Sequence, residues 1–200
     1  APAFRLMNAE AKANRLAKLG VDVLYEVPFN KALASLTPKE FAEEVIVKRL
    51  GLCHVIVGAD FCFGKDRAGT TEVLVALGKE LGFGVTIVPL LALEAGEVSS
   101  TAIRTSLAEG DPQGAASMLG HLHRIEGTVI RGDQRGRELG YPTANMSITG
   151  LHHPKLGVYA VKVDVLTGPH KGTYGGAASI GVRPMFGDNV PNCASFIFDF

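Results

Sequence analysis

The sequence predicts an α/β domain built on a parallel sheet, followed by a small antiparallel β-barrel. Three observations favour this fold class. Short apolar runs alternate with helical stretches in the first part of the chain, and helical periodicity ends near Arg124. Glycine also becomes denser, since residues 1–119 hold 11 of the 24 glycines and residues 120–200 hold 13. We therefore predict two domains, at residues 1–120 and 121–200.

The first domain shows three strand-like runs separated by helices. A helix is expected from Asn8 to Leu19, where Gly20 ends it, and a strand is expected to follow over residues 21–27. Thr37, Pro38 and Glu40 form a capping sequence that opens a second helix, which ends near Gly51. The remaining elements are a strand at 55–57, a helix at 70–81 and a strand at 85–90. This βαβ order indicates a parallel sheet.

Two short helices and then a series of strands complete the chain. The helices are expected to begin at Ser99 and at Asp111, and the second ends at Gly120. Beyond Arg124, β-rich runs alternate with glycine-containing turns, which favours an antiparallel barrel. The runs include Ile125, Val129, Tyr159, Val161, Val163, Val165 and Ile180. The last residues lie in an apolar strand, so we expect the second domain to continue beyond Phe200.

Composition excludes several classes of protein. Twenty basic and 20 acidic side chains give a formal net charge of zero, which argues against binding nucleic acid through bulk positive charge. Apolar runs are too short for a membrane-spanning helix, so we expect no membrane partner. Three cysteines without a CxxC pair suggest neither a disulfide framework nor a zinc site, which fits a reducing cytoplasm.

The first candidate site lies at the start of a helix. Ser99, Ser100 and Thr101 supply hydroxyls there, and Arg104 adds a cationic donor about one turn further on. Free N–H groups at a helix start, together with a guanidinium, can hold the phosphates of ATP. Serine and threonine are also common helix caps, so a purely structural role stays open.

A second candidate follows the strand at 55–57. Asp60, Phe61 and Phe63 lie where open α/β sheets bind ligands, beyond the carboxyl ends of the strands. The two aromatic rings could line a pocket for a flavin or a nucleotide. Ordinary packing of Phe61 and Phe63 in the core is the alternative interpretation.

A third candidate is the glycine-rich, basic stretch 131–145. Its glycines permit close approach to phosphates, and its arginines could neutralise them, although the ending of a Walker loop is absent. If Thr143 and Asn145 lie on a strand, they share one face of it, where their oxygens could ligate Mg²⁺ in a metal–ATP complex. A hairpin with a solvated basic tip is the alternative. The candidate ATP-binding residues are Gly132, Arg135, Gly140, Pro142, Thr143 and Asn145.

Four histidines carry no diagnostic metal-ligand spacing. We expect His121, His123, His152 and His153 to lie at the surface rather than to form a metal site. Cys53 and Cys62 are expected to be small apolar fillers, because no base or cationic cluster lies near them in the sequence.

Six segments in order resemble the family of bacterial bifunctional riboflavin kinase/FMN adenylyltransferases, also called FAD synthetases. The resemblance covers essentially the whole chain, and the order of the segments makes it specific. The segments are Phe4-Arg5-Leu6, residues 57–64, residues 98–104, residues 140–145, residues 157–160 and Gly181-Val182-Arg183-Pro184.

This resemblance implies a Rossmann-like nucleotidyltransferase domain followed by a riboflavin kinase barrel. The first would join FMN and ATP into FAD with release of pyrophosphate, and the second would phosphorylate riboflavin with ATP and Mg²⁺. Ser99, Ser100, Thr101 and Arg104 would then contact ATP, and Asp60, Phe61 and Phe63 would lie near flavin or nucleotide. Thr143 and Asn145 would hold Mg–ATP, while residues 132–140 close over its phosphates.

Two departures from the family pattern bear on activity. The family's early His-x-Gly-His phosphate motif does not occur in this sequence, so we expect the first domain to lack its N-terminal part and this chain not to make FAD unaided. In the kinase half, Ala194 stands where the family carries a glutamate as the base for the riboflavin hydroxyl. Loss of a general base typically lowers a rate by roughly 10²- to 10⁴-fold. A non-catalytic flavin- or nucleotide-binding module is therefore the alternative function.

Overall fold

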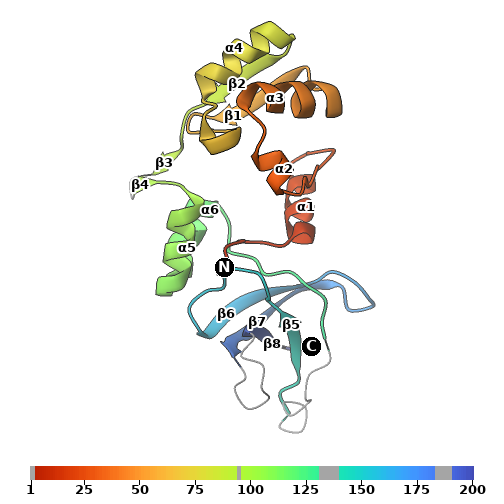
Figure 1. Ribbon diagram of the computed structural model, residues 1–200. Helices are drawn as coiled ribbons and strands as arrows, with labels where there is room; N and C mark the ends of the chain where they lie inside the picture. The colour runs from red at the N-terminus through yellow and green to blue at the C-terminus, as the bar shows by residue number, and fades with distance from the viewer. Residues whose placement is uncertain (1–2, 94–95, 131–139, 183–190) are drawn as a thin grey trace. The chain divides into compact units, whose positions relative to one another are not determined.

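The computed structural model describes residues 3–93, 96–130, 140–182 and 191–200. These residues form two compact units (Figure 1). One unit joins residues 1–24 to residues 99–200, and the other comprises residues 25–98. Each unit is described separately below. No helix in the described ranges is both long and apolar enough to cross a lipid bilayer.

The helices of the 25–98 unit begin and end as their capping residues predict. Thr37 accepts a hydrogen bond from the amide of Glu40, whose carboxylate in turn accepts from the Thr37 amide, so the capping box is complete. Helix α3 (Pro38–Phe41) continues directly into the π-helix η1 (Ala42–Arg49). Thr70 caps α4 (Thr71–Leu81), which ends at Gly82 in the left-handed conformation. Shorter elements are α2 (Lys31–Ala34) and the 3₁₀ turn η2 (Lys65–Arg67).

A two-stranded parallel sheet forms the centre of this unit. Strand β1 (His54–Gly58) pairs with β2 (Gly84–Val88), with His54 opposite Gly84. Helix α4 connects them, which confirms the predicted βαβ order. Two shorter strands, β3 (Ala92–Leu93) and β4 (Gly96–Glu97), pair with each other antiparallel. The buried core consists of Ala42, Ile46, Phe63, Leu74, Leu77 and Phe83.

The strand predicted over residues 21–27 is not present. The segment belongs to no strand, and Val21, Val23, Tyr25 and Val27 are all exposed. The amide of Val21 instead donates to the carbonyl of Leu16, so this amide hydrogen-bonds to the last turn of the preceding helix and not to a neighbouring strand. Alternating apolar residues become a strand only where a neighbouring strand accepts their backbone hydrogen bonds, and none of the described strands does.

Three helices belong to the other unit. Asn8 caps α1 (Ala9–Lys18), Ser99 caps α5 (Ser100–Glu109), and Asp111 caps α6 (Pro112–Leu119). Glycine in the left-handed conformation follows α6 at residue 120, as predicted, and also follows α5 at residue 110. Ile103, Leu107 and Ala115 form a buried cluster against which Leu6, Met118 and Leu119 pack.

The same unit contains a four-stranded antiparallel sheet in the order β5-β8-β7-β6. The strands are β5 (Thr143–Ser147), β6 (Gly157–Val165), β7 (Gly172–Val182) and β8 (Pro191–Ile197). Met146 of β5 and Tyr159 of β6 pack against one core, so both outer strands face the same apolar cluster. That cluster is Ile148, Ala178, Ile180 and Cys193.

The β-rich run predicted at Ile125 and Val129 was wrong in its element type. Neither residue belongs to a strand, and only Ile130 forms an isolated bridge, with Asn145. Ile125 packs on the core as a loop residue. Its apolar character was therefore a signal of burial and not of strand pairing.

Candidate nucleotide-binding sites

The first predicted site lies at the N-terminus of α5. Ser99 has extended backbone geometry, and its hydroxyl accepts a hydrogen bond of 3.2 Å from the amide of Ala102. The structural role of Ser99 as a cap is therefore present. Ser100 and Thr101, the first two residues of α5, are exposed. The positive end of the helix and these two exposed hydroxyl side chains suit an anionic ligand.

The guanidinium of Arg104 donates two hydrogen bonds, both to neutral acceptors. One terminal nitrogen donates to the carbonyl of Phe4 at 3.4 Å, and the other donates to Oγ1 of Thr101 at 3.2 Å. No carboxylate in the described part of the chain lies within ion-pair distance of this guanidinium. Its charge is therefore not neutralised by an acidic partner there, and the Thr101 contact places it beside the helix start.

Thr143 and Asn145 lie on β5 as predicted and share one face of it. Thr143 is exposed, whereas Asn145 is 6% exposed and donates its side-chain amide to the carbonyl of Thr143 at 3.2 Å. A hydroxyl and an amide oxygen are hard neutral ligands of the kind that Mg²⁺ accepts together with water and phosphate. The donor set therefore fits a magnesium–nucleotide complex.

The neighbouring strand β8 places Ala194 directly opposite Asn145. Ala194 also pairs with Ser179 of β7, so these three side chains form a row on one face of the sheet. Thr143 is opposite Phe196, whose ring meets that of Tyr141 edge to face at 5.4 Å. A methyl group thus stands in the middle of a polar row, beside the predicted metal ligands.

The structure describes only part of the rest of the glycine-rich stretch. Arg131, Gly132, Arg135 and Arg137 lie outside the described residues, and their predicted roles stay predictions. Gly140 is described, with a φ of 80° that favours glycine, and Pro142 is exposed immediately before β5.

Asp60, Phe61 and Phe63 follow β1 in the 25–98 unit. Phe63 is 6% exposed and belongs to the core, and the ring of Phe61 stacks on it at 5.5 Å. These contacts account for both rings by packing. Asp60 is exposed at the carboxyl end of β1, where open α/β sheets bind ligands. A ligand role for the three residues stays a prediction.

The four histidines are half-buried, with part of each side chain exposed at the surface. Each has a ring nitrogen within hydrogen-bond distance of a backbone carbonyl, at Leu122 for His121, Leu6 for His123, Arg104 for His152 and Pro154 for His153. Burial lowers the pKa of His123, so this ring is neutral at neutral pH. Within the described ranges, no three His, Cys, Asp or Glu side chains form a metal-binding group. Spacing in the sequence gave no signal for these carbonyl contacts.

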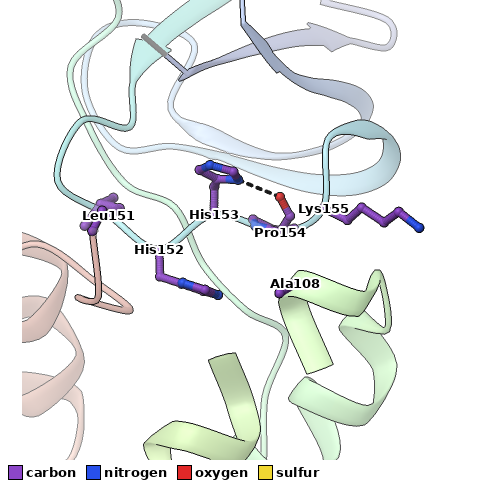
Figure 2. A pocket seen from close by; sticks show the side chains of 7 residues that line it. Ala108, Leu151, His152, His153, Pro154 and Lys155 are labelled. Carbon is purple, nitrogen blue, oxygen red and sulfur yellow. Dashed lines mark hydrogen bonds between the residues drawn. The ribbon is translucent and has the colours of Figure 1, made fainter. Parts of the chain in front are cut away.

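A small hollow lies beside the segment that carries two of these histidines (Figure 2). Its lining includes Ala108 of α5 and residues 151–155. In Figure 2 the side chains of His152 and His153 leave the chain in opposite directions, and His153 turns toward the carbonyl of Pro154. The charged end of Lys155 extends away from the hollow, so it does not converge with the two imidazole rings on one point.

Comparisons with known proteins find a family match in each part of the chain. A model of the FAD synthetase family matches residues 1–102, and a model of the riboflavin kinase family matches residues 119–200. The chain is 39% identical over 197 residues to the bifunctional riboflavin kinase/FMN adenylyltransferase of Bacillus subtilis. It is 38% identical over 200 residues to the protein of that name from Haemophilus influenzae.

These matches cover nearly all of this chain but only part of each relative. The alignments span 96% of this chain and 60% of the Bacillus subtilis protein, and 100% of this chain and 64% of the Haemophilus influenzae protein. A crystal structure described as a macrolide-efflux protein from Streptococcus pneumoniae superposes with a TM-score of 0.80 at 33% identity. That match covers 98% of this chain and 62% of the other.

Proposed function

The chain belongs to the family of bifunctional riboflavin kinase/FMN adenylyltransferases, and from this membership we propose that it serves FAD biosynthesis. The proposed reactions are phosphorylation of riboflavin to FMN by ATP, and adenylylation of FMN to FAD with release of pyrophosphate. We assign the second reaction to residues 1–120 and the first to residues 121–200. The family matches, which end at residue 102 and begin at residue 119, support this division.

In the adenylyltransferase half, the N-terminus of α5 would bind the triphosphate of ATP. Backbone N–H groups and the hydroxyls of Ser100 and Thr101 would orient the phosphates, and Arg104 would neutralise charge that builds up as pyrophosphate leaves. Ser99 would fix the helix start through its cap. Asp60, Phe61 and Phe63 are proposed to lie near the flavin or nucleotide. Positioning and charge stabilisation would carry this reaction, because nucleotidyl transfer needs no covalent enzyme intermediate.

In the kinase half, Thr143 and Asn145 would hold Mg–ATP on β5. Magnesium, when bound, would shield the negative charge of the phosphates. The exposed hydroxyl of Thr143 and the buried amide of Asn145 would orient the nucleotide from one face of the sheet. Gly132, Arg135, Gly140 and Pro142 are proposed to bring the preceding loop over the phosphates.

A second candidate function is a non-catalytic module that binds flavin or nucleotide on the same scaffold. The observation that favours it is Ala194, whose methyl group occupies the row between Asn145 and Ser179. A methyl group cannot take the proton of the riboflavin hydroxyl, so binding without efficient transfer follows from this position.

The kinase proposal depends on one observation, that the side chains of Thr143 and Asn145 lie on the same face of β5. Substitution of both residues tests whether they bind Mg–ATP. Changing both to alanine is expected to weaken Mg–ATP binding at the β5 site about 10- to 100-fold, because two oxygen ligands are lost together, and to leave the α5 site unchanged. Riboflavin affinity should change far less. Calorimetric titration with each ligand measures both effects.

Ser147→Ala is the matched control, because Ser147 lies on the same strand and the same face. It should leave Mg–ATP binding near the unsubstituted value. Equal losses of ATP and riboflavin binding in the double variant would indicate general unfolding and contradict the assignment.

We further propose that the partners are small molecules and that the protein acts in the cytoplasm. Cys53, Cys62 and Cys193 are free thiols, which supports a reducing compartment. The balanced net charge supports flavin and ATP rather than nucleic acid as ligands.

A further inference from the structure

We propose that His152 is a positioning residue that holds Arg104 in place for the triphosphate. This inference rests on the proposed role of α5 in binding ATP. The geometry that supports it is a closed set of hydrogen bonds among three segments far apart in the sequence, around Phe4, Arg104 and His152.

His152 contacts two of these segments at once. Its backbone amide donates to the carbonyl of Arg5 at 2.8 Å, next to a parallel bridge between Arg5 and Leu151. Its ring Nε2 lies 2.9 Å from the carbonyl of Arg104. Because a carbonyl only accepts, Nε2 must carry the proton in this contact. One residue therefore fixes the Phe4–Arg5 segment and the middle of α5 relative to each other.

Arg104 is the other end of the same set of contacts. Its backbone carbonyl accepts from His152, while its guanidinium donates to the carbonyl of Phe4, the residue before Arg5. The backbone carbonyl of Arg104 therefore contacts His152, and its guanidinium contacts the Phe4–Arg5 segment that His152 also holds. The hydrogen bonds to Phe4 and Thr101 are long and have neutral acceptors, so they can orient the guanidinium and still be replaced by bonds to an anionic phosphate.

The contact from His152 can be removed without removing the helix. A carbonyl oxygen has two lone pairs, so a carbonyl inside a helix can accept from a side chain in addition to its helical partner. The segment after His152 is also held independently, because the amide of Lys155 donates to the carbonyl of Leu107 at 2.8 Å. Loss of the imidazole should therefore loosen Arg104 while the helix and its packing persist.

A double-mutant cycle tests the proposal in the full chain, with Thr143→Ala present throughout to weaken the second ATP site. Arg104→Ala is expected to weaken Mg–ATP binding about 10- to 100-fold. His152→Ala should weaken it about fivefold when Arg104 is present, and should have no further effect when Arg104 is already alanine. His152→Gln, which retains a donor, should recover most of the affinity. Calorimetric titration gives each dissociation constant.

Two results would overturn the inference, and they differ from each other. If Arg104→Ala leaves ATP binding unchanged, the proposed ATP site on α5 is wrong, and the role of His152 fails with it. If Arg104→Ala weakens binding but His152→Ala has no effect, or has the same effect in both backgrounds, only the positioning role is wrong. His153→Ala is the matched control, since its ring contacts Pro154 rather than α5, and it should change nothing.

Discussion

Replacing Ala194 with glutamate is expected to raise the rate of FMN formation by about 10²- to 10⁴-fold, the usual contribution of a general base. The new carboxylate would extend from β8 on the face that carries Asn145, next to the proposed ATP ligands. It would there accept the proton of the riboflavin hydroxyl as that oxygen attacks the terminal phosphate. Measurement of FMN production from riboflavin and Mg–ATP, with and without the substitution, gives the ratio directly.

Ala194→Gln separates a base from a simple change in size. Glutamine has nearly the same shape as glutamate but no basic carboxylate, so its rate should stay at that of the unsubstituted chain. An Ala194→Glu variant that binds both ligands but forms no more FMN would contradict the view that this chain is a riboflavin kinase lacking only its base, and would support the non-catalytic module.

Leu74→Ala is expected to lower the free energy of unfolding of the 25–98 unit by about 2 to 5 kcal/mol. Leu74 is fully buried in the cluster that joins α4 to η1 and to Phe63, so truncation removes apolar contacts and leaves a cavity. Urea denaturation combined with hydrogen exchange of the α4 amides measures the loss within this unit. Unchanged protection of those amides would show that the cluster is not the core.

Leu91→Ala is the control for that experiment. Leu91 belongs to the same unit but is 64% exposed, so the same truncation should cost under about 1 kcal/mol. Comparable losses from Leu74→Ala and Leu91→Ala would mean that burial does not determine the stability of this unit.

Helix boundaries could be predicted from the sequence because they depend on neighbouring residues. Thr37 and Glu40 satisfy each other's backbone groups three residues apart, and Ser99 does the same for Ala102. Glycine after a helix, as at Gly82, needs only its own conformational freedom. Such signals act locally and are present in the chain before any packing occurs.

The strand prediction over residues 21–27 was wrong because a strand is completed by another strand. Val21, Val23 and Tyr25 alternate as strand residues do, yet alternation says nothing about which partner accepts their hydrogen bonds. The same limit applies to Ile125, which is apolar because it packs on a core as part of a loop.

The candidate sites likewise contain features that the local sequence predicts and features that depend on long-range contacts. Given a strand at Thr143 and Asn145, period two correctly predicted that they share a face, because side-chain alternation is a local property. The contact of His152 with the carbonyl of Arg104 joins residues 48 positions apart, and a backbone acceptor leaves no trace in the sequence. Only the folded arrangement could reveal it.

The central claim is that this chain has two separate ATP sites, one at α5 and one on β5. Calorimetric titration of the intact chain with Mg–ATP tests it most directly. We expect two molecules of ATP to bind per chain, Arg104→Ala to remove one of them, and Thr143→Ala to weaken the other. Binding of a single ATP, or loss of all binding in either variant while the fold is retained, would contradict the claim.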